Sequence, residues 1–155
     1  MVAMEQFLSA ITSVVSLPLY DAGIKSISNL KGAVLTSDPV PWPSIFSGIE
    51  VIVNRQTPDH RDSGGSSAMY DLLVSLGNAY QAMFHLSDLG AELTYCPGTL
   101  VYNLGKVLEH GVHVWEKDER IVIAHWFKDN VHDKLGVERP RIPLQFHFLD
   151  QIGTR

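Results

Sequence analysis

The chain has 155 residues, of which 45% are hydrophobic and 19% charged, and its formal net charge is -5 at pH 7. This length suits one domain with a sizeable core, and the composition excludes intrinsic disorder. The acidic balance argues against a protein that holds nucleic acid by charge alone, because non-specific affinity comes largely from Lys and Arg at phosphates. A nucleic-acid substrate would therefore need a local basic rim.

The single cysteine, Cys96, cannot form an internal disulfide. The apolar stretch from Phe7 to Tyr20 has neither the basic flank of a signal peptide nor the length of a membrane span. We therefore expect an intracellular protein, nuclear or cytoplasmic, with no membrane association. No feature of the sequence indicates an obligate protein partner.

The chain begins with a predicted amphipathic helix over Met4–Leu17, which Pro18 is expected to end. Residues 37–48 carry three prolines and predict a loop. Short β-type runs separated by turn signals then occupy 50–55, 71–77, 79–86, 91–95, 99–105, 111–116 and 120–127. Residues 129–136 predict a short helix capped by Asp129 or Asn130 and ended by Gly136. The proline-punctuated tail is expected to dock on the surface.

Seven runs of this length and spacing predict an all-β core, a sandwich or barrel, with peripheral helices (α+β). We expect a single domain over 1–155. In it, 1–41 would form an N-terminal helical support packed on the outside, 42–127 the β core, and 128–155 the short helix and the docking tail.

A candidate metal site lies just beyond the run 50–55, where His60 and Asp62 are two positions apart. In extended chain this spacing points both side chains to one face. His110 and His113 are possible third ligands, and a turn could place His110 at a strand end facing the pair. Two histidines and a carboxylate form the facial triad of non-haem iron(II) oxygenases, although three ligands and a water would also suit zinc.

Arg120 favours iron over zinc. It lies downstream of His110, at the start of the run 120–127. An arginine beside the metal can hold a carboxylate through a bidentate, charge-assisted pair. This is what a 2-oxo-dicarboxylic acid that chelates iron needs at its far end. A His-x-Asp pair alone is common by chance, whereas the full order of His-x-Asp, a long β pattern, His and then Arg is much rarer.

Four runs of sequence resemble the iron(II)- and 2-oxoglutarate-dependent dioxygenases of the Tet/JBP superfamily, specifically the small branch abundant in fungi. They are WPSIFSGIEVIVNRQTPDHRD, YDLLVSLG, YCPGTLVYNLGKVLEHGV and ERIVIAHWFKDNVH, in order within residues 42–132. The resemblance implies a double-stranded β-helix, the jelly-roll fold of cupins. It also implies that His60, Asp62 and His110 hold Fe(II), that Arg120 pairs with 2-oxoglutarate, and that O2 is consumed. No catalytic residue is assigned beyond this metal centre.

The resemblance further implies hydroxylation of a methylated nucleobase in DNA, coupled to oxidative decarboxylation of 2-oxoglutarate to succinate. The target methyl group is that of 5-methylcytosine or thymine, and for some members that of N6-methyladenine. A flipped or single-stranded base is expected, because a methyl group inside a duplex is out of reach. Two hypotheses stay open. One is the same iron chemistry on a small molecule or protein side chain, which the acidic charge favours. The other is an inactive jelly-roll binding module, against which the intact triad and Arg120 count.

The chain departs from animal members of the superfamily at two places. Their polar residue two after the arginine is Val122 here, so Asn54 becomes a candidate for 2-oxoglutarate binding, with a strand-end backbone contact as the simpler interpretation. Their base-holding asparagine after His-x-Asp is replaced by Ser63, Gly64 and Gly65, so base recognition cannot be carried over at this loop. The polar and aromatic candidates for substrate contact are Arg61, Tyr70, Lys128, Asp129 and Asn130.

Overall fold

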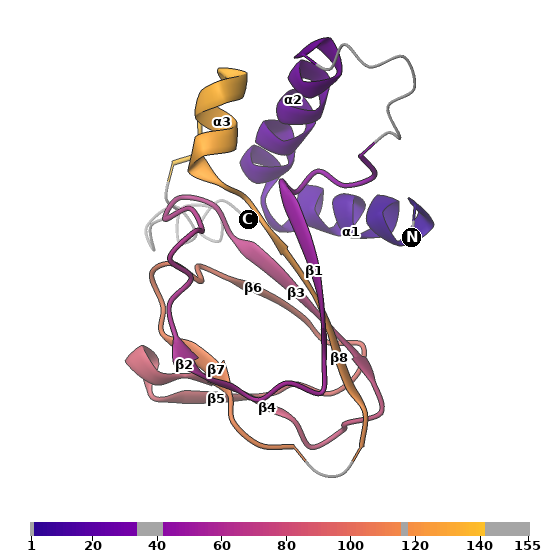
Figure 1. The fold of residues 1–155 in the computed structure, drawn as a ribbon, viewed down its shortest axis with the longest axis vertical. Helices are drawn as coiled ribbons and strands as arrows, with labels where there is room; N and C mark the ends of the chain where they lie inside the picture. The colour runs from indigo at the N-terminus through magenta and orange to yellow at the C-terminus, as the bar shows by residue number, and fades with distance from the viewer. Residues whose placement is uncertain (1, 34–41, 116–117, 142–155) are drawn as a thin grey trace, which may run out of the picture.

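The computed structural model describes residues 2–33, 42–115 and 118–141. Two helices come first, eight strands and one short 3-10 turn follow, and a further helix ends the described part of the chain (Figure 1). The helices are α1 (Val2–Val15), α2 (Leu17–Ala33) and α3 (Asp129–Leu135), and the 3-10 turn is η1 (Ser87–Leu89). Within these residues no helix is both long and apolar enough to cross a membrane.

The strands form two four-stranded antiparallel sheets, which lie one above the other in Figure 1. The first has the order β1-β8-β3-β6 and the second β2-β7-β4-β5. Their bounds are β1 Gly48–Val53, β2 Thr57–His60, β3 Asp71–Gly77, β4 Met83–Leu86, β5 Ala91–Thr94, β6 Leu100–Asn103, β7 His110–Val112 and β8 Arg120–Trp126. The chain passes repeatedly between the sheets, as in a jelly roll, so the expected fold class is confirmed.

Two apolar clusters hold these layers together. One contains Leu8 of α1, Leu19 of α2 and Leu72 of β3, so it lies between the helices and the outer face of the first sheet. The other contains Phe84 of β4 and Val122 of β8, so it lies between the two sheets. The amphipathic N-terminal helix therefore packs outside the β core, as predicted, and the space between the sheets is left for a site.

The first helix ends at Val15, before Pro18, as predicted, but a second helix that was not predicted, α2, begins at Leu17. A proline is tolerated in its first turn, where a missing N–H would have no partner. The predicted cap of α3 is wrong. Neither Asp129 nor Asn130 caps α3. The cap position is Lys128, without a side-chain hydrogen bond, and Asp129 is already helical. Gly136 ends α3 in the left-handed conformation, with φ 64°, as expected.

The strand predictions are right in kind and differ in extent. The run 79–86 is a strand only over Met83–Leu86, and β2 was not predicted at all, because its sequence TPDH lacks apolar alternation. Residues 42–47 are irregular, as expected for the proline-containing loop, and Phe46 carries the chain into the core. The rest of that loop and the docking tail from 142 onward lie outside the described residues.

Candidate metal centre

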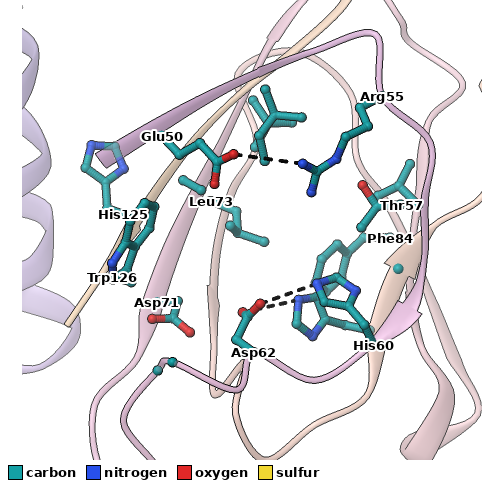
Figure 2. A pocket seen from close by; sticks show the side chains of 18 of the residues that line it. Glu50, Arg55, Thr57, His60, Asp62, Asp71, Leu73, Phe84, His125 and Trp126 are labelled. Carbon is teal, nitrogen blue, oxygen red and sulfur yellow. Dashed lines mark ion pairs between the residues drawn. The ribbon is translucent and has the colours of Figure 1, made fainter. Parts of the chain in front are cut away.

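The pairing of β2 with β7 brings the two predicted histidine ligands together. The strands are antiparallel neighbours, and their register places His60 directly opposite His110. The ring centroids are 4.5 Å apart. Asp62 follows β2, and its backbone N–H donates to the carbonyl of Gly105 at 2.9 Å. One ligand atom from each of the three residues lies within 4.8 Å of the others, and Figure 2 shows the Asp62 carboxylate facing the imidazoles.

Both imidazoles turn Nε2 toward the Asp62 carboxylate. Nδ1 of His60 bonds to the carbonyl of Pro58 at 2.9 Å, and Nδ1 of His110 bonds to the carbonyl of Leu108 at 3.0 Å. A carbonyl oxygen only accepts, so Nδ1 is the nitrogen that carries the proton in the neutral form of each ring, and Nε2 is the nitrogen available to a metal. Metal-binding histidines are held in this way. The donor set of two imidazoles and one carboxylate therefore fits Fe(II).

The Arg61 side chain leaves the pocket and joins other segments instead. Its guanidinium donates to both carboxylate oxygens of Asp88, at 2.7 and 2.9 Å, and its Nε donates to the carbonyl of Val107 at 3.1 Å. Asp88 also accepts the backbone N–H of Glu109 at 2.7 Å. We call Arg61, Asp88 and Glu109 the clamp, because they connect the segment of His60 and Asp62 to the residue before His110.

Arg120 enters the same pocket from the opposite sheet. The residue is only 4% exposed, and its guanidinium lies over the rings of Tyr95 and Trp115 at 5.7 and 5.3 Å. One terminal nitrogen donates to the carbonyl of Arg55 at 2.9 Å, whereas Nε has no partner among the described residues. Burial lowers the pKa of Arg120, but arginine stays charged in proteins. The guanidinium thus keeps donor capacity for an anion.

Asn54 supports the backbone of Arg120. Its side-chain oxygen accepts the Arg120 N–H at 2.8 Å, and its own N–H donates to the Arg120 carbonyl at 2.8 Å. Its φ of 49° is left-handed, a conformation that asparagine tolerates better than most residues. Asn54 does not line the pocket, so the structure places it as the strand-end backbone contact.

A pocket of about 270 Å³ contains the triad and Arg120 and is lined by both sheets. Its apolar wall includes Leu73, Phe84 and Trp126, which Figure 2 shows around the cavity. The indole of Trp126 lies where a side chain on Gly48 would stand, so the wall needs a glycine there. The other polar residues of the lining are Glu50, Arg55, Thr57, Ser63, Asp71, Tyr95, His125 and Lys128.

Asp71, at the start of β3, is a pocket residue that the sequence did not single out. It is 4% exposed, and neither carboxyl oxygen has a well-aligned hydrogen bond to the described residues, although the backbone of Gly105 is close to Oδ2. Burial, and then the nearby charge of Asp62, raise the pKa of Asp71 to about 8, against a smaller lowering by the Gly105 backbone N–H. The available signal was an acidic residue opening an otherwise apolar strand.

The five predicted substrate contacts are scattered. Only Lys128 lines the pocket. Tyr70 packs against the apolar cluster under the helices, and Asn130 is exposed on α3. Asp129 accepts from Arg139 at 2.7 Å. The fifth, Arg61, belongs to the clamp.

A family model matches the sequence, and a solved structure shares the fold. The Tet_JBP family model, described as the oxygenase domain of the 2OGFeDO superfamily, matches residues 1–129. No curated protein matches the sequence. The solved structure of NgTET1 in complex with 5mC DNA is 14% identical, with a TM-score of 0.61, over 99% of this chain and 56% of that one. A Cupin 2 conserved barrel domain protein from Salinispora arenicola is 17% identical, with a TM-score of 0.44, over 68% of this chain and 90% of that one.

Proposed function

Since the chain belongs to the Tet/JBP family of oxygenase domains, whose superfamily uses iron(II), 2-oxoglutarate and O2, we propose that it hydroxylates the methyl group of a 5-methylcytosine-type base in DNA. The observation that carries the proposal is one pocket holding the His60, Asp62 and His110 triad with Arg120 on the facing sheet. The structural neighbour determined with 5mC DNA supports this class of substrate. N6-methyladenine and thymine are further candidate bases for the same reaction.

The residues of the chain would divide the work as follows. His60, Asp62 and His110 would hold the metal through Nε2 and carboxylate oxygens. Arg120 would pair with the distal carboxylate of 2-oxoglutarate, a role suited to its planar fork. When bound, the metal and cosubstrate supply the oxidising power for C–H hydroxylation. Burial of the guanidinium strengthens its pairing with an anion, because little water competes there.

The rest of the pocket suits a flat base turned out of its strand. Leu73, Phe84 and Trp126 offer apolar and aromatic walls, as a flipped base requires. Lys128 is exposed at the lining and can meet a phosphate. Extrusion from a duplex costs a few kcal/mol, so single-stranded or mismatched DNA should react best.

The test has two stages. Anaerobic Fe(II) and 2-oxoglutarate should give a weak visible charge-transfer band that disappears in His60→Ala and persists in His113→Ala, a control histidine that is outside the pocket. Aerobic incubation with methylated oligonucleotides, followed by mass spectrometry of the nucleosides, should then show a hydroxylated base. Absence of the band and of metal uptake in the wild-type protein would leave an inactive binding module as the better description.

A second candidate is the same chemistry on a small molecule or a protein side chain. The net charge of -5 and the carboxylates of Glu50 and Asp71 in the pocket favour it. Succinate production without any oxidised base, over a panel of methylated DNA, would support this candidate and contradict the first.

A further inference from the structure

We propose that Asp71 determines substrate specificity by accepting a hydrogen bond from the exocyclic amino group at position 4 of the 5-methylcytosine-type base. The inference rests on the proposed function and deepens it, because it assigns one polar group of the substrate to one residue of the chain. Nothing in the sequence pattern of the metal centre marks Asp71 for this role.

The first observation is a buried carboxyl group without a well-aligned hydrogen bond in the described part of the chain. Asp71 is 4% exposed, and its one nearby donor is the backbone N–H of Gly105, which leaves acceptor capacity on both oxygens. Buried polar groups are nearly always paired, and an unpaired one costs about 1–3 kcal/mol. A ligand that donates to Asp71 would remove this cost. The residue is therefore suited to a partner that arrives with the substrate.

The second observation is its place in the pocket. Asp71 lines the cavity together with Asp62, Gly65 and Trp126, and Figure 2 shows it between Trp126 and Asp62. A carbon placed on Gly65 would lie 3.7 Å from Oδ2 of Asp71 and 3.7 Å from Cβ of Asp62. Gly64 and Gly65 bring no side chain to the pocket, so Ser63 is the polar side chain that this loop contributes to the lining. The carboxyl of β3 is the nearest polar side chain to that space.

The chemistry of the base agrees with this placement. The amino group and the methyl group of 5-methylcytosine stand on adjacent ring atoms, so a methyl directed at the metal centre keeps the amino group close to it. Asp71 is beside Asp62, one of the proposed metal ligands, and an aromatic wall at Trp126 would hold the ring in plane. A carboxyl oxygen accepts a hydrogen bond whether or not the group is ionised. The contact therefore does not depend on how Asp71 titrates.

The experiment compares two single-stranded oligonucleotides with wild-type and variant protein. One carries 5-methylcytosine, and the other carries 5-methylpyrimidin-2-one, which lacks the amino group and keeps the methyl. Wild type should prefer the first by about tenfold to a hundredfold in kcat/KM, the range of a specific base contact. Asp71→Ala should lose this preference by losing activity on 5-methylcytosine alone, and Asp71→Asn, which keeps an acceptor oxygen, should recover part of it. Asp21→Asn, exposed on α2, is the matched control.

Asp71 could instead support the metal ligand Asp62, and the same experiment distinguishes this role from contact with the base. In that case Asp71→Ala would weaken the Fe(II) and 2-oxoglutarate band and reduce activity on both oligonucleotides equally, which would overturn the inference. An unchanged preference in Asp71→Ala would overturn it as well, while oxidation of 5-methylcytosine by the wild type would still uphold the proposed function. A wild type that consumes 2-oxoglutarate and oxidises no 5-methylcytosine would contradict both.

Discussion

At the scale of single residues, the candidate metal ligands are oriented by their own surroundings before any ion is bound. Backbone carbonyls fix the ring orientation of His60 and His110, and the Asp62 N–H is held by Gly105. Such preorganisation lowers the entropic cost of metal binding, since the rotamers are already selected. Residues that hold these segments in place should therefore influence metal affinity without being ligands.

Arg61 is the clearest such residue. Arg61→Ala removes its bidentate bond to Asp88 and loosens the clamp between the two ligand segments. We expect Fe(II) affinity to fall about tenfold to a hundredfold, as for other groups that support metal ligands. Anaerobic titration calorimetry measures this, with Lys25→Ala on the exposed side of α2 as control. Unchanged metal affinity together with a raised KM for DNA would instead favour direct substrate contact by Arg61.

His132 gives the protein a pH-dependent stability. It is fully buried, and neither ring nitrogen has a hydrogen-bond partner among the residues that the structure describes. Burial, followed by the charge of Arg139, lowers its pKa below 6.5. Below about pH 6.5 the unfolded chain binds a proton at His132 that the folded chain does not, so stability falls as the pH decreases. His132→Phe should flatten this loss between about pH 7.5 and 5.5. Urea unfolding at several pH values measures the slope, and a slope equal to that of the wild type would refute the assignment.

At the scale of elements, one wall of the pocket depends on a glycine in β1, which leaves room for a tryptophan of β8. Gly48 pairs with Trp126, and a carbon added at Gly48 would lie 2.6 Å from Cζ2 of the indole. Gly48→Ala should displace Trp126 and raise the KM for methylated DNA severalfold, with an unchanged Fe(II) and 2-oxoglutarate band. Val51→Ala, exposed on the same strand, serves as control. Equal KM values for Gly48→Ala and wild type would exclude Trp126 from substrate binding.

Local patterns explain which elements could be predicted from the sequence. Short, nearly continuous apolar runs made β3 and β8 recognisable, and Gly136 marked the end of α3. The polar strand β2 and the helix α2 were missed because the first lacks an apolar face and the second starts beside Pro18. The spacing of His60, Asp62 and His110 indicated the candidate ligands, and the family resemblance added the jelly-roll topology. The register that places His60 opposite His110 is a tertiary contact, so no local pattern predicts it.

The substrate contacts predicted from the sequence were wrong where they rested on closeness to the metal ligands along the chain. Arg61 and Tyr70 were considered for substrate contact because they are near the ligands in sequence, yet their side chains turn into the clamp and into the helix-facing core. Asp71 escaped notice because an acidic residue before an apolar run usually marks a solvated strand end. Its burial results from the sheets facing each other, which is a property of the whole fold.

At the scale of the molecule, metal and cosubstrate should stabilise the folded state by mass action. At a concentration of a hundred times Kd, a ligand specific for the folded state adds about 2.7 kcal/mol. For a chain of this size that corresponds to a Tm increase of about 5–10 °C. Differential scanning fluorimetry with Fe(II) or Mn(II) should show the shift, EDTA should reverse it, and His110→Ala should lack it. An identical shift in His110→Ala would mean that the metal binds elsewhere.

The division of the site between two sheets has a mechanical consequence. The triad is carried by β2, β7 and the loop after β2, whereas Arg120 belongs to β8 of the other sheet. A cosubstrate held by the metal ligands at one end and by Arg120 at the other would connect the two sheets, so its affinity would depend on the distance between them. Phe84 and Val122 pack between the sheets and help to set that distance. A change in the size of either side chain should therefore alter 2-oxoglutarate affinity, although neither residue is charged.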